Sequence, residues 1–133
     1  MSKEKLYIFD TTLRDGAQTQ GVDFSIDDKV KISNSLDTLG VDYIEGGWPG
    51  ANPTDTEFFN KDHGFKNAKL TAFGMTKKTE HSAKNDPMLA SLINSKSSSV
   101  CLFGKSWDFQ VDVALGISNE ENLQNISESA KHI

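Results

Sequence analysis

The stretch FDTTLRDGAQ, residues 9–18, places two acids, an arginine and a glutamine directly behind the apolar run LYIF. Arg14 and Asp15 are adjacent, and such a pair can serve one ligand. The carboxylate can hold a divalent cation while the guanidinium holds an oxygen atom of the ligand beside it. Charges at the end of a buried strand cost desolvation free energy unless they are paired or used. This stretch is therefore the first candidate for a functional site.

A third acid follows the next apolar run, in YIEGGWPG, where Glu45 comes directly after two strand-forming residues. At the end of a neighbouring strand, Glu45 could hold Arg14 by a charge-assisted hydrogen bond. The glycines behind it would let backbone and ligand approach closely; they are Gly46, Gly47 and Gly50. In a purely structural alternative, Asp15 caps a turn and Arg14 forms an ion pair with Glu45. The residues alone leave both interpretations open.

Four apolar runs rich in strand formers alternate with helical patterns along the chain. The runs are KLYIFDT (5–11), VDYIEGGW (41–48), KLTAFGMT (69–76) and SSVCLFGKS (98–106). Nearly continuous apolar runs are typical of parallel strands that are covered on both faces. The alternation predicts an α/β fold with right-handed crossovers, either an open doubly wound sheet or a (βα)8 barrel. The first strand–helix loop has no GxGxxG or Walker-type pattern, which argues against a nucleotide-binding open sheet.

A (βα)8 barrel takes about 250 residues, so the 133 residues of this chain would supply about half of one. Each expected helix has its own start signal: Ser25 with Asp28, Thr54 with Glu57, Asp86 with Pro87, and Ser118 with Glu121. Gly40 would end the first helix. The expected core-facing positions are Ile26, Val30, Leu36 and Leu39 in the first helix, and Leu123, Ile126, Ala130 and Ile133 in the last.

Composition narrows the function classes. The formal net charge of −5 argues against a nucleic-acid groove or an anionic membrane surface as partner. The single cysteine, Cys101, lies in the apolar run VCLFG and is expected to be a buried thiol in a reducing compartment. No segment is long and apolar enough to span a bilayer, and MSKEK does not begin a signal peptide. We therefore expect a cytoplasmic protein.

The stretches FDTTLRDGAQ and GVDYIEGGWPGANPTD together resemble the start of the DRE-TIM metallolyase superfamily. Within it, they are most similar to the 2-isopropylmalate, homocitrate and citramalate synthases. LFGKSWDF and NEENLQNISES are similar to that group as well, so the resemblance covers essentially the whole chain. It implies that residues 1–133 form a single domain, the N-terminal (βα)4 portion of a TIM barrel.

The resemblance also implies an acyltransferase of branched-chain amino-acid biosynthesis, which joins acetyl-CoA to a 2-oxo acid by Claisen condensation. By the same matching, Asp15 would ligate a divalent metal, Mg, Mn or Zn. Arg14 would bind the 2-oxo acid and stabilise the developing oxyanion. Glu45 would position Arg14 or help proton transfer, and Gln18 would lie near the outer shell of the metal, in the substrate site.

The chain departs from that family in its metal ligands. The family completes its metal site with an HxH pair, whereas His63, His81 and His132 are dispersed and are expected at the surface. We therefore expect weak metal binding and no catalysis by the isolated chain. The alternative is a truncated, catalytically silent half-barrel that self-associates or binds a partner. A half-barrel has exposed strand edges, so we expect the isolated chain to form a homo-oligomer. A flavodoxin-like binding domain has little support from motifs.

Overall fold

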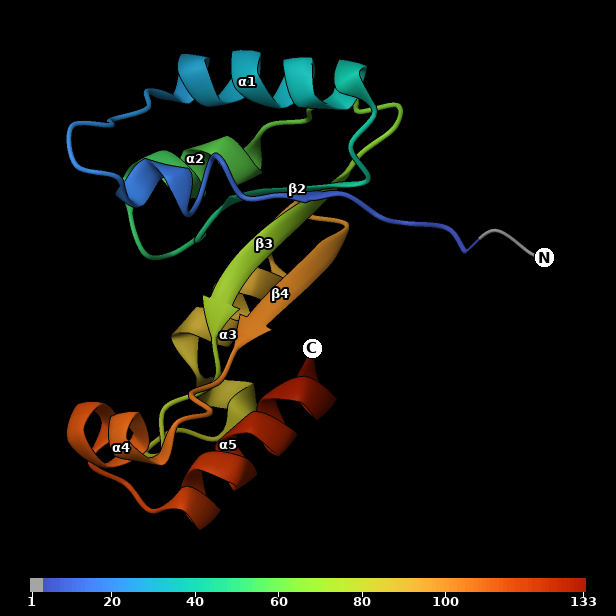
Figure 1. Ribbon diagram of the computed structural model, residues 1–133. Helices are drawn as coiled ribbons and strands as arrows, with labels where there is room; N and C mark the ends of the chain where they lie inside the picture. The colour runs from blue at the N-terminus through green and yellow to red at the C-terminus, as the bar shows by residue number, and fades with distance from the viewer. Residues whose placement is uncertain (1–3) are drawn as a thin grey trace.

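The computed structural model describes residues 4–133, and its centre is a sheet of four parallel strands (Figure 1). The strands are β1 (Phe9–Asp10), β2 (Tyr43–Gly47), β3 (Lys69–Met75) and β4 (Ser99–Phe103), and they neighbour one another in sequence order. All three pairings are parallel. The predicted α/β fold of sequential parallel (βα) units is confirmed.

Helices follow the strands, with short turns between them. The helices are α1 (Ile26–Leu39), α2 (Pro53–Asn60), α3 (Pro87–Ile93), α4 (Asp108–Gln110) and α5 (Asn119–His132). Two 3₁₀ turns, η1 (Gly16–Gln18) and η2 (Ala83–Asn85), precede α1 and α3, and α4 runs into a π-helical turn, η3 (Val111–Leu115). No helix between residues 4 and 133 has the length and apolar character needed to cross a membrane.

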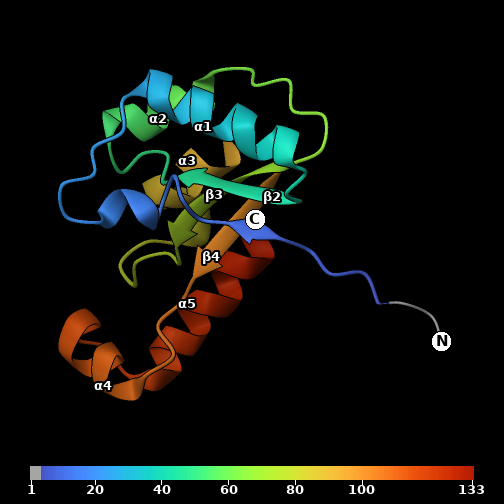
Figure 2. The same ribbon diagram turned by 45° about the horizontal axis from the view of Figure 1, so that its top comes forward.

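The hydrophobic core lies between the sheet and the layer formed by α1, α2 and α3 (Figure 2). Because side chains alternate between the two faces of a strand, Ile44, Leu70 and Ala72 point into this core together. They meet the fully buried side chains of the helices: Phe58, Phe59, Leu89 and Leu92. The other face of the sheet presents aromatic side chains, and Phe103 there is 45% exposed. The two faces are therefore unequal, and only one is covered by helices.

The first strand is shorter than predicted. Of the run 5–11, only Phe9–Asp10 forms a strand, and the Leu6 and Ile8 side chains are 86% and 60% exposed. The carbonyl of Ile8 still accepts hydrogen bonds from the backbone N–H groups of Asp42 and Tyr43, both at 3.1 Å. At the edge of the sheet, β1 has one neighbour instead of two. This explains why an apolar run predicted to be buried remains open here.

The start of α2 also differs from the prediction. The cap is Asn52 and not Thr54: the Asn52 Oδ1 atom accepts the backbone N–H of Asp55 at 2.8 Å, and Pro53 occupies the first helical position. Proline is favoured there because its missing N–H would have no partner within the helix. The capping boxes of Ser25 with Asp28 and of Ser118 with Glu121 are confirmed.

The faces that α1 and α5 bury are largely polar. Val30 and Leu36 pack against the core as predicted, but other predicted core-facing positions do not. Leu39 is 78% exposed and Leu123 is 65% exposed. The buried residues are Lys29, Ser33 and Asp37 in α1, and Asn122, Asn125 and Ser129 in α5. Most of these side chains bind backbone groups of neighbouring loops, as the Ser129 hydroxyl does in accepting the N–H of Lys77 at 2.9 Å. Loop backbone groups that leave water need such partners.

Asp37 allows a test of how much these buried polar contacts between helix and loop stabilise the fold. Its carboxylate accepts the backbone N–H groups of Lys66, Asn67 and Ala68 at 3.0, 2.8 and 2.7 Å. The N–H of Ala68 above all lowers the pKa of Asp37 against the opposing effect of burial. Because the folded pKa lies below the unfolded one, the stabilisation is present above the unfolded pKa and is lost as pH falls through the folded pKa.

We predict that Asp37→Asn lowers the free energy of unfolding by about 1–3 kcal/mol at pH 7. The difference from the wild type should shrink as pH falls below about 4, where the carboxylate becomes neutral. Urea denaturation at several pH values measures both effects. Asp27→Asn, an exposed change in the same helix, is the control and should be near neutral. An equal loss of unfolding free energy at all pH values would contradict the stabilising role of the Asp37 carboxylate.

Candidate active site

Arg14, Asp15 and Glu45 meet at the carboxyl ends of β1 and β2. Arg14 lies in the loop after β1, and its Nε–H donates to the Oε1 atom of Glu45, on β2. Its Nη1 atom donates to Oδ1 of Asp15 at 3.0 Å. The structure thus brings together the three charged residues that the sequence singled out. Their chemical roles remain predictions.

The loop that carries Arg14 is held by its own backbone. The carbonyl of Thr11 accepts the N–H groups of Arg14, Asp15 and Gly16 at 3.2, 2.8 and 3.2 Å. Asp10 accepts the backbone N–H and the hydroxyl of Thr12, both at 3.0 Å. Thus Asp10, the first acid after the apolar run, stabilises the turn, which is a common use of aspartate in loops.

Burial makes the Arg14–Glu45 ion pair asymmetric. The Glu45 side chain is 1% exposed and the Arg14 side chain is 21% exposed. The guanidinium carbon of Arg14 lies 4.3 Å from the centre of the Phe73 ring, and Trp48 meets that ring edge-on at 5.4 Å. A buried carboxylate without a cation would be strongly destabilising. Glu45 and Phe73 therefore fix the side of the guanidinium from which a ligand could approach.

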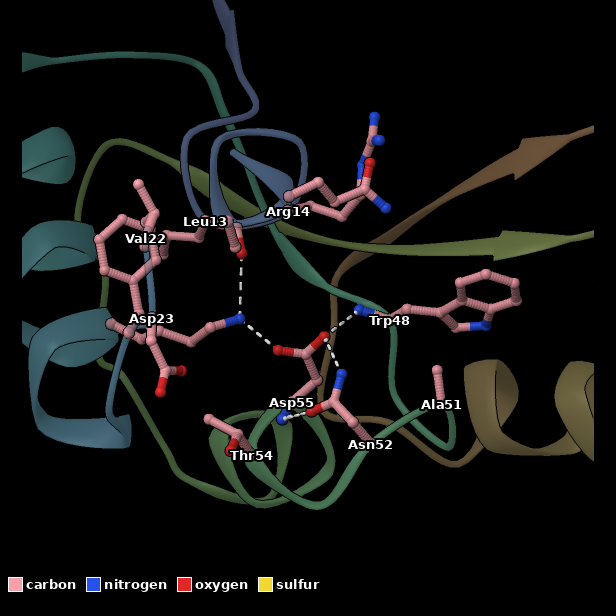
Figure 3. A pocket seen from close by; sticks show the side chains of 13 residues that line it. Leu13, Arg14, Val22, Asp23, Trp48, Ala51, Asn52, Thr54 and Asp55 are labelled. Carbon is pink, nitrogen blue, oxygen red and sulfur yellow. Dashed lines mark hydrogen bonds and ion pairs between the residues drawn. The ribbon is translucent and has the colours of Figure 1, made fainter. Parts of the chain in front are cut away.

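Asp15 and Gln18 lie at the open side of this group. The Asp15 side chain is 63% exposed, and Gln18 is exposed on η1. A cavity of about 490 Å³ opens beside them, between the loop after β1 and the start of α2 (Figure 3). Arg14, Gln18 and Trp48 line it, together with Asp23, Asn52 and Thr54. The cavity therefore offers both hydrogen-bond donors and hydrogen-bond acceptors next to Arg14.

The glycines after Glu45 pack against protein atoms, which corrects the prediction that they admit a ligand. A Cβ atom on Gly46 would lie 2.7 Å from Phe58 Cε1, inside the core. Gly47 has φ of 141°, and a Cβ atom there would lie 2.5 Å from Cγ of Asp55. These positions need glycine because the helix layer, and not a ligand, approaches the strand so closely.

Two functional candidates escaped the sequence analysis, Lys29 and Asp55. Lys29 is 3% exposed, and its Nζ donates to the carbonyls of Leu13 and Gly46 at 3.0 and 2.9 Å and to Oδ1 of Asp55. The sequence does contain a pattern that points to Lys29. Polar residues recur there at four-residue spacing, at Lys29, Ser33 and Asp37, which places them on one face of a helix.

The remaining candidate side chains lie in mixed environments. Cys101 is half-buried where a buried thiol was expected; burial raises its pKa, and the charge of Glu45 adds to this effect. Two of the histidines predicted at the surface are half-buried. The ring of His63 packs between Phe58 and Phe65, and burial lowers its pKa. His81 lies 3.5 Å from a carboxylate oxygen of Asp86. His132 is exposed, as predicted.

The fit of a divalent metal depends on Asp15. Among residues 4–133, no group of three or more His, Cys, Asp or Glu side chains is arranged to hold a metal ion. Asp15 could supply one oxygen ligand, but one of its oxygen atoms also accepts a hydrogen bond from Arg14. The described residues therefore do not form a complete metal site by themselves, since Mg²⁺ and Mn²⁺ prefer several oxygen ligands.

Curated relatives match this chain along nearly its whole length. It is 52% identical to an (R)-citramalate synthase of Aquifex aeolicus over 98% of this chain and 25% of that protein. It is 32% identical to a 2-isopropylmalate synthase of Sulfolobus acidocaldarius over 99% of this chain and 33% of that protein. The chain thus spans a quarter to a third of the length of these relatives.

A solved structure supports the fold. The hydroxymethylglutaryl-CoA lyase of Pseudomonas aeruginosa superposes with a TM-score of 0.68 at 19% identity, over 96% of this chain and 42% of that protein. At this identity the likeness concerns the fold alone, a TIM barrel of which this chain matches a part. Residues 5–133 match the HMGL-like family, and the chain belongs to that family.

Proposed function

We propose that this chain forms the arginine–carboxylate part of the active site of an acyltransferase that condenses acetyl-CoA with a 2-oxo acid. The observation that carries the proposal is the half-buried ion pair between Arg14 and Glu45 at the carboxyl ends of β1 and β2. Active sites of TIM barrels lie at this end of the strands. The 52% identity to an (R)-citramalate synthase supports the reaction class.

The proposed reaction places specific demands on the site. The methyl group of the acetyl thioester loses a proton, and its carbon forms a bond to the ketone carbon of the 2-oxo acid. The π electrons of the ketone move to its oxygen, which becomes an alkoxide and then takes up a proton. Fixed hydrogen-bond donors at that oxygen lower the barrier because they are already oriented before the charge develops.

Arg14 is suited to this task. Its Nε–H faces Glu45 and one Nη1 proton faces Asp15, while its Nη2 group takes part in no hydrogen bond or ion pair among residues 4–133. Nη2 could therefore donate to the ketone oxygen of the substrate. Glu45 and Phe73 hold the guanidinium from two sides, so little side-chain freedom would be lost when the substrate binds.

Asp15 and Gln18 would complete this side of the site. In the proposal, Asp15 supplies one oxygen ligand to a divalent metal, whose other ligands come from outside residues 4–133. A bound divalent metal would polarise the ketone of the 2-oxo acid. Gln18, on the wall of the cavity, would contact the polar end of the substrate or the outer shell of the metal. Residues 1–133 would then act as one (βα)4 unit of a larger barrel.

A second candidate function is self-association without catalysis. It is favoured by the open face of the sheet, where Phe9 and Phe103 are 43% and 45% exposed, and by the edge positions of β1 and β4. Edge strands and exposed aromatic side chains favour pairing with a second copy.

The first function can be tested in a chimera in which this chain replaces the matching quarter of the Aquifex aeolicus (R)-citramalate synthase. We predict turnover of acetyl-CoA and pyruvate by the chimera and none by the isolated chain. In the chimera, Arg14→Lys should lower kcat by about 10²-fold, because lysine keeps a charge near Glu45 but loses the planar fork of donors. The KM for pyruvate should change less than kcat.

Lys31→Ala, an exposed change on α1, is the control and should leave both constants near their original values. Arg14→Ala alone would be ambiguous, because it also leaves the buried Glu45 carboxylate without its cation. An Arg14→Lys chimera with unchanged kcat would refute the oxyanion role. An inactive chimera that folds would argue for the second candidate.

Metal binding gives another prediction. The isolated chain should bind Mn²⁺ or Zn²⁺ weakly, with a Kd of about a millimolar or more, because Asp15 is one ligand where several are needed. In the active chimera, adding a chelator should abolish turnover, and Asp15→Asn should raise the metal concentration needed to restore it. Isothermal titration of the chain measures the first effect. Micromolar one-to-one binding that Asp15→Asn abolishes would show that the chain holds further ligands.

Self-association is tested by light scattering at micromolar concentration. We predict dimers or larger assemblies of the isolated chain, since its open sheet face is apolar and its edge strands have unpaired backbone groups. Phe103→Ser, a change on that face, should shift the distribution towards monomer, whereas Leu39→Ser, an equally drastic change at the exposed end of α1, should not. A compact monomer at all concentrations would contradict the prediction.

A further inference from the structure

The ammonium group of Lys29 connects three segments of the chain that meet at the candidate site. Its Nζ atom donates to the carbonyl of Leu13 at 3.0 Å, to the carbonyl of Gly46 at 2.9 Å, and to the carboxylate of Asp55. Leu13 belongs to the loop after β1, Gly46 to the end of β2, and Asp55 to α2. Lys29 itself belongs to α1 and is 3% exposed.

The two carbonyls have informative neighbours. Leu13 directly precedes Arg14, and Gly46 directly follows Glu45. We propose that Lys29 is a positioning residue. Its buried ammonium group fixes the backbone next to Arg14 and Glu45 and thereby keeps their side chains in contact. The catalytic meaning of this role rests on the proposed function, but the geometric role does not.

An ammonium group suits these acceptors in number and shape. Lysine has three donors around one nitrogen, and the Lys29 ammonium has three oxygen partners, two of them neutral and one charged. Every proton is therefore used, which offsets the cost of burying the charge. A planar guanidinium would spread its donors over several ångströms and could not bring three segments to one point.

Asp55 extends the connection to the wall of the cavity. Its Oδ2 atom accepts the backbone N–H of Trp48 and the side-chain amide of Asn52, both at 2.9 Å (Figure 3). Its own N–H donates to Oδ1 of Asn52 at 2.8 Å. Only glycine fits at position 47, against this carboxylate. The ion pair between Lys29 and Asp55 therefore fixes the loop after β1, the end of β2 and the loop that precedes α2.

If Lys29 only stabilised the fold, its loss would have the same effect as the loss of any other buried polar residue of α1. Asp37 provides the comparison, because it is buried on the same face of α1 and also binds the backbone of neighbouring segments, but at residues 66–68. Loss of either residue should destabilise the fold. Only the loss of Lys29 should loosen the contact between Arg14 and Glu45.

The chain offers a direct readout of that contact, because Arg14 is its only arginine. In a ¹⁵N-labelled sample, the single Nε–H signal therefore belongs to Arg14 without further assignment. That proton donates to Glu45 and should exchange slowly with water. We expect Lys29→Met to speed the exchange by about tenfold or more, whereas Asp37→Asn should leave it within about twofold of the wild type.

Lys29→Met leaves the Asp55 carboxylate buried without its cation, so it could prevent folding. The second variant, Lys29→Met with Asp55→Asn, removes both charges and keeps an amide oxygen for the N–H of Trp48. Fast Nε–H exchange in this variant, with the backbone amides of β3 still protected, would support the positioning role. Slow, wild-type-like exchange in either folded variant would overturn it. Since the measurement needs no turnover, it is independent of whether the proposed reaction is correct.

Discussion

The site depends on one constraint, a glutamate carboxylate buried in the sheet. With 1% of the Glu45 side chain exposed, its charge needs a partner that is itself held in place. Arg14 supplies the cation from the loop after the neighbouring strand β1, and it can do so only if that loop keeps its shape. The bonds of the Thr11 carbonyl to three successive N–H groups provide that shape. The position of Arg14 is therefore a consequence of electrostatic compensation for Glu45 and of local turn geometry together.

Helix α1 serves both ends of the sheet through its buried polar face. Near its start, Lys29 binds segments at the carboxyl ends of β1 and β2. Near its end, Asp37 binds the three N–H groups that directly precede β3. A helix in a (βα) unit runs back along its sheet, so one face can reach both sets of loops. Apolar side chains could not satisfy those backbone groups, and this explains why the buried side chains at these two points of α1 are charged.

The alternation of apolar runs and helical patterns predicted the parallel sheet, and the resemblance to a TIM-barrel family implied its strand order. The acids at the strand ends pointed to a contact between Arg14 and Glu45. The sequence did not predict the buried Lys29–Asp55 pair, since burial of a lysine depends on which loops come to lie over it. The cap of α2 was misplaced by two residues because Thr54 with Glu57 imitates a capping box, while Pro53 favours a start at Asn52. The run around β1 is exposed because β1 has only one neighbouring strand, and a strand-forming pattern does not predict how many neighbours a strand has.

Several of the described residues orient Arg14. Asp15, Glu45 and Phe73 touch its guanidinium group, and Lys29 holds the backbone next to it through Leu13. Further ligands of a metal, in contrast, would have to come from outside residues 4–133. The arginine would then be oriented before a substrate or a metal arrives, so binding would cost little reorganisation there. In the proposed function, this division separates a preorganised donor from a metal site whose other ligands come from outside residues 4–133.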